Sequence, residues 1–316
     1  MTAQPGHHPQ QRGTLPYLAL ALLALVWGFS YILIKTGVAT IPPTVLVELR
    51  VALGAAALLA ATAITRRNPI TTSTKQRLPG FLLMAVTSSV LPFLAITWGQ
   101  QYIGTGLAAI LNATTPLWTA IFAWWVTPQE RPTTINYTGV AIGFVGAVVL
   151  VAPSLSRSGL KADTLGALAV LAGSAFYAAA ALGQRRLLNQ VDAMEASLWQ
   201  MAIATLIMLP ISAPTIPSTH PSALSLAAVI LLGTVGSGIA YVLYYYILNS
   251  LGATRGSSVT FLIPITAVGW GALLFHERLT APVIAGMVVI LVGVGLAMVH
   301  RRPRAPAIAP EAESAA

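Results

Sequence analysis

The residues best suited to binding a solute lie inside apolar stretches and recur at matching positions in two halves of the sequence. Residues 88–131 align with residues 236–278 at an offset of about 148, which pairs Pro116 with Pro264. This spacing is much longer than the roughly 20 to 50 residues of a solenoid repeat. It indicates duplication of a membrane-spanning unit, with the functional residues between the two halves.

Aromatic and polar residues share one depth in these stretches. Trp27 and Tyr177 are paired by an offset of about 150, and each falls near the middle of its stretch. Proline removes a helical hydrogen bond and frees a carbonyl group at membrane depth, so Pro116 and Pro264 are candidate hinges. Polar side chains in hydrocarbon must face protein or water. We predict a substrate cavity lined by Trp27, Trp98, Asn112, Tyr177, Ser237, Tyr241 and Thr260.

Each of these residues also has a purely structural interpretation. Buried Ser and Thr side chains commonly bond to their own helix, prolines can shape packing, and a Trp can fill an apolar interface. The mirrored placement of the set in both halves favours the cavity. Its aromatic faces, amides and hydroxyl groups would suit a neutral or zwitterionic solute with an apolar part.

Two charged residues interrupt the second apolar stretch. Glu48 and Arg50 are predicted at the cavity mouth, near the outer end of that stretch. Two positions apart on a helix, they point to different faces and form no ready ion pair. Arg50 could either extend outward to water or project into the cavity. Glu130 and Glu277 end two other stretches, where loop-fixing hydrogen bonds are their expected role.

The composition is typical of a membrane protein. Of 316 residues, 56% are hydrophobic and 8% are charged, whereas roughly a quarter are charged in an ordinary soluble domain. The 17 Lys and Arg residues are scattered, so no basic stripe could follow a nucleic-acid backbone. There is no Cys, no phosphate-binding loop, and no Ser, His and Asp set at one depth. We therefore predict no enzyme activity, metal site, cofactor or nucleic-acid partner.

Ten apolar stretches have about the length that a helix needs to cross the hydrocarbon core, roughly 20 residues at 1.5 Å each. A cleaved signal peptide is the alternative for the first, but its apolar region should stop within about 15 residues. The predicted class is an all-α polytopic membrane protein of two inverted five-helix repeats, residues 15–152 and 164–299. Residues 1–14 and 300–316 are predicted to be cytoplasmic tails. The expected spans are 15–34, 44–64, 78–101, 104–126, 136–152, 164–188, 196–212, 224–248, 253–275 and 282–299.

The distribution of Lys and Arg predicts the orientation, because cytoplasmic loops hold the excess. With the amino terminus inside, the inner side carries twelve of these residues and the outer side four. Both termini are then cytoplasmic, in a protein of the cytoplasmic membrane. Since five spans separate the copies, the second half is inverted relative to the first, as in many secondary transporters. The four outer residues are Lys35, Arg157, Lys161 and Arg278.

Three motifs stand out: VWGFSYILIK in the first stretch, ELR in the second, and LGATRGSSVTFLIPITAVGWGALLFHERLT across the ninth. They resemble the EamA-type transporters of the drug/metabolite transporter superfamily over about residues 15 to 300. The resemblance implies a central cavity lined by spans 1, 3, 4, 6, 8 and 9, and export of small metabolites such as amino acids. TPQER in the first repeat, and Phe176-Tyr177 where a Trp is common, depart from the family pattern.

We expect a secondary transporter that exports amino-acid-like, neutral or zwitterionic solutes by alternating access. Uptake and drug efflux are the alternatives within transport. A lipid-modifying enzyme would need a nucleophile, metal ligands or an acid/base pair, and a scaffold would not need paired prolines at the midplane. Glycines spaced three or four apart could pack helices closely or support a homodimer. They are Gly139, Gly143, Gly146, Gly286 and Gly293.

The orientation can be tested on the natural sequence because it lacks Cys. We predict that Ser218→Cys reacts with an impermeant maleimide applied to intact cells, whereas Ser73→Cys reacts only after the membrane is permeabilised. The physical basis is the twelve-to-four bias of Lys and Arg. The opposite labelling pattern would reverse the orientation.

Overall fold

The apolar stretches become helices, because the hydrocarbon core offers no hydrogen-bond partner to an open backbone. The computed structural model describes residues 14–66, 74–126, 133–158, 161–188, 191–256 and 259–298. Residues 1–13 and 300–316 of the predicted tails, and Glu130, lie outside these ranges.

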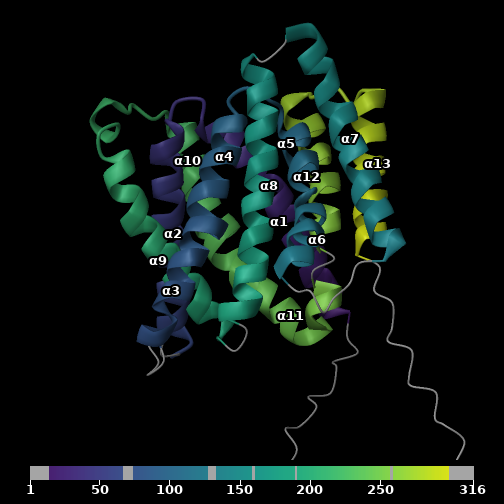
Figure 1. The fold of residues 1–316 in the computed structure, drawn as a ribbon. Helices are drawn as coiled ribbons and strands as arrows, with labels where there is room; N and C mark the ends of the chain where they lie inside the picture. The colour runs from purple at the N-terminus through teal and green to yellow at the C-terminus, as the bar shows by residue number, and fades with distance from the viewer. Residues whose placement is uncertain are drawn as a thin grey trace, which may run out of the picture.

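Each predicted crossing contains one or more helical segments (Figure 1). The first two are α1 (Leu15–Gly37) and α2 (Pro43–Ile64). The third joins α3 (Thr74–Met84), the π-helical η1 (Ala85–Val90) and α4 (Leu91–Gly99), and the fourth joins α5 (Thr105–Asn112) and α6 (Thr115–Val126). The remaining elements are α7 (Thr134–Ser158), α8 (Ala162–Leu187), α9 (Ala193–Ser212), the short η2 (Ile216–Ser218), α10 (Ala223–Leu231), the π-helical η3 (Leu232–Ile239), α11 (Ala240–Gly256), α12 (Val259–Phe275) and α13 (Ala281–Ala297).

The predicted class, an all-α polytopic membrane protein, is confirmed. Within the described residues, eight continuous segments are long and apolar enough to cross a membrane, and α12 and α13 are shorter apolar helices that complete the ten crossings. One boundary differs from the expectation. The eighth crossing continues through α11 to Gly256, so the ninth begins at Val259 rather than at residue 253. Pro264 therefore lies closer to the start of its helix than predicted.

The fourth crossing is broken just before its proline. Pro116 has no N–H group to donate to the carbonyl oxygen of Asn112. The Thr115 hydroxyl group donates to that oxygen instead, at 2.8 Å, and the Thr114 hydroxyl group donates to Leu111 O at 2.7 Å. The freed carbonyl group is thus satisfied within the helix.

The two halves of the chain share one core. In Figure 1, α1 of the first half packs on α12 of the second, α2 packs on α9, and α4 packs on α8. The α2 helix also packs on η3. Side chains from both halves belong to the same buried apolar cluster, including Leu46 of α2 and Val229 of α10. Because neither half buries this surface alone, the cavity between them is a property of the whole chain.

The outermost pair of helices, α7 and α13, meets through glycines. A Cβ added to Gly293 would lie 2.5 Å from the Cα of Gly143 and 2.7 Å from the carbonyl oxygen of Gly139. One added to Gly286 would lie 2.5 Å from the side chain of Leu150. These glycines bring the two backbones together inside one chain. Of the two roles that their spacing suggested, the structure shows close helix packing within one chain.

We predict that Gly293→Ala lowers the free energy of unfolding by about 1 to 3 kcal/mol, because the methyl group forces two helix backbones apart. Thermal unfolding in detergent would measure this as a lower melting temperature. Gly295→Ala is the matched control, since a Cβ at Gly295 would meet nothing within 4 Å and Ala is the better helix former. Equal melting temperatures for the two variants would contradict close backbone packing at Gly293.

Candidate functional site

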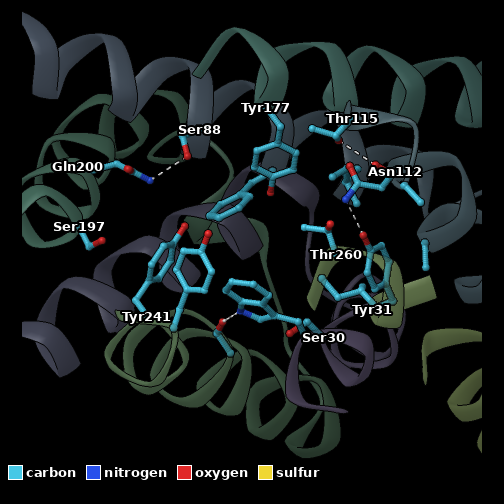
Figure 2. A pocket seen from close by; sticks show the side chains of 18 of the residues that line it. Ser30, Tyr31, Ser88, Asn112, Thr115, Tyr177, Ser197, Gln200, Tyr241 and Thr260 are labelled. Atoms are coloured by element: carbon cyan, nitrogen blue, oxygen red, sulfur yellow. Dashed lines mark hydrogen bonds between the residues drawn. The ribbon is translucent and has the colours of Figure 1, made fainter. Parts of the chain in front are cut away.

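A cavity of about 350 Å³ lies between the two halves of the chain. Its wall comes from eight of the ten crossings, and only α7 and α13 contribute nothing to it among the described residues. Figure 2 shows polar side chains from both halves pointing into the same space. The polar and aromatic lining residues are Trp27, Ser30, Tyr31, Arg50, Ser88, Phe93, Asn112, Thr115, Tyr177, Gln184, Ser197, Gln200, Tyr241, Tyr244 and Thr260.

One wall of the cavity is aromatic and is centred on Trp27. The Trp27 ring meets Tyr241 edge-on, with centroids 6.2 Å apart, and tilts against Tyr244 at 5.3 Å. The indole Nε1 donates to the carbonyl oxygen of Gly236, at 3.2 Å. This bond joins α1 to the π-helical η3 and fixes the plane of the ring, so its face is a preformed surface for the apolar part of a solute.

Another part of the wall carries an amide group. Asn112 Nδ2 donates to the hydroxyl oxygen of Tyr31 at 2.8 Å, and Ser174 Oγ lies 3.4 Å from Asn112 Oδ1 (Figure 2 shows the first of these bonds). Asn112 is the last residue of α5, directly before the break in the fourth crossing. The break therefore turns this amide toward the cavity, and Tyr31 and Ser174 hold it there.

Two further polar contacts occupy equivalent places in the two halves. Gln200 Nε2 donates to Ser89 Oγ at 2.8 Å and to Ser88 Oγ at 3.2 Å. Arg50 Nε donates to Ser237 Oγ at 3.0 Å. The offset of about 150 pairs Arg50 with Gln200, and the offset of about 148 pairs Ser89 with Ser237. The same hydrogen bond is therefore made twice, each time from the second helix of one repeat to the π-helical segment of the other.

Among the described residues, the cavity is accessible from one end of the bundle. Gln184, near the end of α8, and Thr260, near the start of α12, are lining residues with exposed side chains. At the other end, the lining residues Ile34, Ile96 and Ala109 are buried. The accessible end is the one where α1 begins and α13 ends (Figure 1).

Hydrogen bonds donated by Lys35 and by the Gln100 side chain hold the closed end together within the first repeat. Lys35 Nζ donates to Gln100 O at 2.7 Å and to Ile103 O at 3.0 Å, which satisfies carbonyl groups beyond the end of α4. The Gln100 side chain donates to Tyr31 O at 3.0 Å. A cation near the end of a helix also interacts favourably with the helix dipole.

Glu277 seals the same end between the two repeats. Its Oε1 accepts from Thr105 N at 2.6 Å and from Thr105 Oγ1 at 2.8 Å, and its Oε2 accepts from Gly106 N at 3.0 Å. A carboxylate is favoured there because the first N–H groups of a helix lack partners within the helix. This confirms the loop-fixing role expected for Glu277.

Most of the sequence-predicted residues meet at the cavity. Trp27, Asn112, Tyr177, Tyr241 and Thr260 line it, together with both candidate hinges, Pro116 and Pro264. Arg50 also lines it, so the side chain projects inward rather than out to water. The sequence interpretation missed Tyr31, Tyr244 and Gln200. Gln200 had a signal, because the repeat alignment places it on Arg50.

Three predicted residues lie elsewhere. Trp98 is 37% exposed and packs edge-on against Tyr102 with centroids 5.0 Å apart, which corrects the expectation that it faces the cavity. Ser237 is buried behind Arg50 and contacts that side chain rather than the cavity. Glu48 is buried and lines no part of the cavity. Arg50 is buried in the cavity wall and Glu48 is buried outside it, so the placement of both at the mouth is also corrected.

Ten helical crossings in two halves, around a polar and aromatic cavity, are the architecture of a multi-pass membrane transporter. The chain belongs to the EamA-like transporter family, whose model matches residues 14–152 and 164–299. The resemblance seen in the motifs is thereby confirmed. The wall also includes α2 and α9, which extends the six-span lining that the resemblance implied.

Individual relatives are distant and cover most of the chain. The sequence is 28% identical to an uncharacterized inner membrane transporter, YedA, of Escherichia coli K12, over 94% of this chain and 95% of the relative. It is 26% identical to a probable terminal-alkyne amino-acid exporter of Streptantibioticus cattleyicolor, over 79% of this chain and 82% of the relative. One crystal structure matches with a TM-score of 0.63 at 18% identity, covering 91% of this chain and 99% of that one, and supports the fold alone.

Proposed function

We propose that this transporter exports amino-acid-like solutes, neutral or zwitterionic and with an apolar part, across the cytoplasmic membrane by alternating access. The observation that carries the proposal is the cavity between the two repeats, which has an aromatic wall at Trp27, a fixed amide at Asn112, and one accessible end. The named activity of the Streptantibioticus cattleyicolor relative supports the solute class and the direction.

The cycle that we propose begins from the state described above. With both termini cytoplasmic, as the distribution of Lys and Arg predicts, a solute enters from the cytoplasm past Gln184 and Thr260. Its apolar part packs on Trp27 and its polar end reaches Asn112. Release on the far side requires that the bonds from Glu277 to Thr105 and Gly106 separate, while the accessible end closes.

Trp27 and Asn112 provide a direct test of solute binding. Cells that overproduce the protein are expected to tolerate raised levels of amino acids or their analogues, and Trp27→Ala or Asn112→Ala should abolish this tolerance at equal expression. Trp98→Ala is the matched control, because that ring lies outside the cavity. Growth at increasing solute concentration is the measurement. Strong resistance to quaternary ammonium dyes that is retained in Glu48→Gln would contradict the proposed solute class.

Pro264 is proposed as a hinge of the ninth crossing, as Pro116 is of the fourth. We predict that Pro264→Ala lowers the transport rate in proteoliposomes more than it lowers equilibrium binding. The reason is that Ala restores an N–H donor to α12 and stiffens one conformation. Pro210→Ala is the control, since Pro210 lies inside α9 but is exposed and outside the cavity. Unchanged turnover in Pro264→Ala would reduce this proline to a packing element.

A further inference from the structure

Arg50 is held in the cavity wall by contacts that leave part of its guanidinium group available. The residue is only 9% exposed, yet it lines the cavity. Its Nε is used by Ser237, and its Cζ lies 3.6 Å above the centroid of the Phe93 ring. A guanidinium group has five N–H donors in a rigid plane. The single bond to Ser237 and the stacking on Phe93 fix the orientation of that plane while leaving its terminal nitrogens unoccupied by these two contacts.

The charge of Arg50 has no acidic partner on the wall. Among the described residues that line the cavity there is neither Asp nor Glu. Tyr31, Tyr177 and Tyr241 are close enough to interact with Arg50 electrostatically, but a neutral hydroxyl group does not balance a positive charge. A buried cation without an anion is unfavourable. The cavity is therefore prepared to receive a negative group beside Arg50.

The second repeat shows that a charge is not required to build this part of the wall. Gln200 occupies the position equivalent to Arg50 and bonds to Ser89, the equivalent of Ser237. A neutral amide thus makes the same contact between repeats. The positive charge is an addition on one side of an otherwise repeated arrangement, which points to a role beyond helix packing.

We infer that Arg50 binds the carboxylate group of the transported solute. This inference rests on the proposed function, because it assigns the acid group of an amino-acid-like solute to one residue of the same cavity. An Arg fork matches the two oxygens of a carboxylate, and charge-assisted bonds of this kind are stronger than neutral ones. The site would reject solutes that carry only a positive charge, since they would face Arg50 without a compensating group. Ser237 acts as a positioning residue for the fork.

The test compares L-phenylalanine with one analogue that lacks the carboxylate group and with another that lacks the amino group. Binding of L-phenylalanine, L-phenylalaninamide and 3-phenylpropanoate to the purified full-length protein in lipid nanodiscs is measured by calorimetry. The natural protein should bind both carboxylates about 10- to 100-fold more tightly than the amide, the ratio expected for hydrogen bonds to a charged group. Equal affinity for all three, or no binding of either carboxylate, would overturn the inference.

Variants then assign the preference to Arg50. Arg50→Gln should reduce carboxylate binding to the level of the amide, and Arg50→Lys, which keeps the charge and loses the fork, should be intermediate. Arg66→Gln removes an exposed cation just beyond the end of the same helix and should bind as the natural protein does. A carboxylate preference that survives in Arg50→Gln would refute the assignment.

A charge-exchanged variant guards against misfolding of Arg50→Gln. Arg50→Gln combined with Gln200→Arg moves the cation to the equivalent position of the other repeat, and the carboxylate preference should return at least in part. Binding of 3-phenylpropanoate that depends on Arg50, in a protein that confers no amino-acid tolerance on cells, would leave the anion site standing and refute the proposed function. Amino-acid export that is unaffected in Arg50→Gln would refute the assignment of the carboxylate to Arg50 and leave the proposed function standing.

Discussion

The structure depends on one constraint: inside the hydrocarbon core, polar groups find hydrogen-bond partners only in the protein or in a water-filled cavity. The Asn112 carbonyl group freed by Pro116 is taken by Thr115, the Asn112 amide is taken by Tyr31, and the Gln200 amide is taken by Ser88 and Ser89. These bonds pull polar side chains from different helices toward one region. The cavity forms where they converge, and the apolar faces of the same helices are left for lipid.

The two repeats make the same hydrogen bond, although the residue that donates it differs between them. Arg50 and Gln200 differ in charge and shape, yet each donates to the equivalent serine of the opposite repeat. Both serines lie in π-helical segments, Ala85–Val90 and Leu232–Ile239. Such segments are rare, and they are frequent at functional sites because the extra residue in the turn re-aims side chains. The repeated feature is therefore a hydrogen bond between the repeats, and only the first repeat makes it with a charged residue, Arg50.

The sequence predicts the fold well because the hydrocarbon thickness prescribes the length of each span, and ten apolar stretches leave few alternatives. The inward-facing side chains are harder to predict, since a span that is apolar all round has no periodicity to mark its buried face. The π-helical segments add a second difficulty: one extra residue rotates everything beyond it by about 100° relative to a regular helix. Trp98 follows η1 and is exposed, whereas Tyr244 follows η3 and lines the cavity. Trp27 and Tyr177 could be identified because the repeat alignment pairs positions by their offset in the sequence, which does not require knowing which face of a helix they occupy.

The closed end is held by polar contacts between the two repeats. Glu277 reaches from one repeat to the first N–H groups of α5 in the other, and Gly104, Gly106 and Gly271 allow the close approach. Every one of these bonds joins polar groups at the end of a crossing, where water can replace the lost partner when the repeats separate. Breaking them costs far less than breaking the same bonds at the centre of the membrane, where no substitute exists. In the alternating-access cycle that we propose, the contacts that must change are therefore at the ends of the helices. The bonds between Arg50 and Ser237 and between Gln200 and Ser89 would remain while the repeats turn about one another.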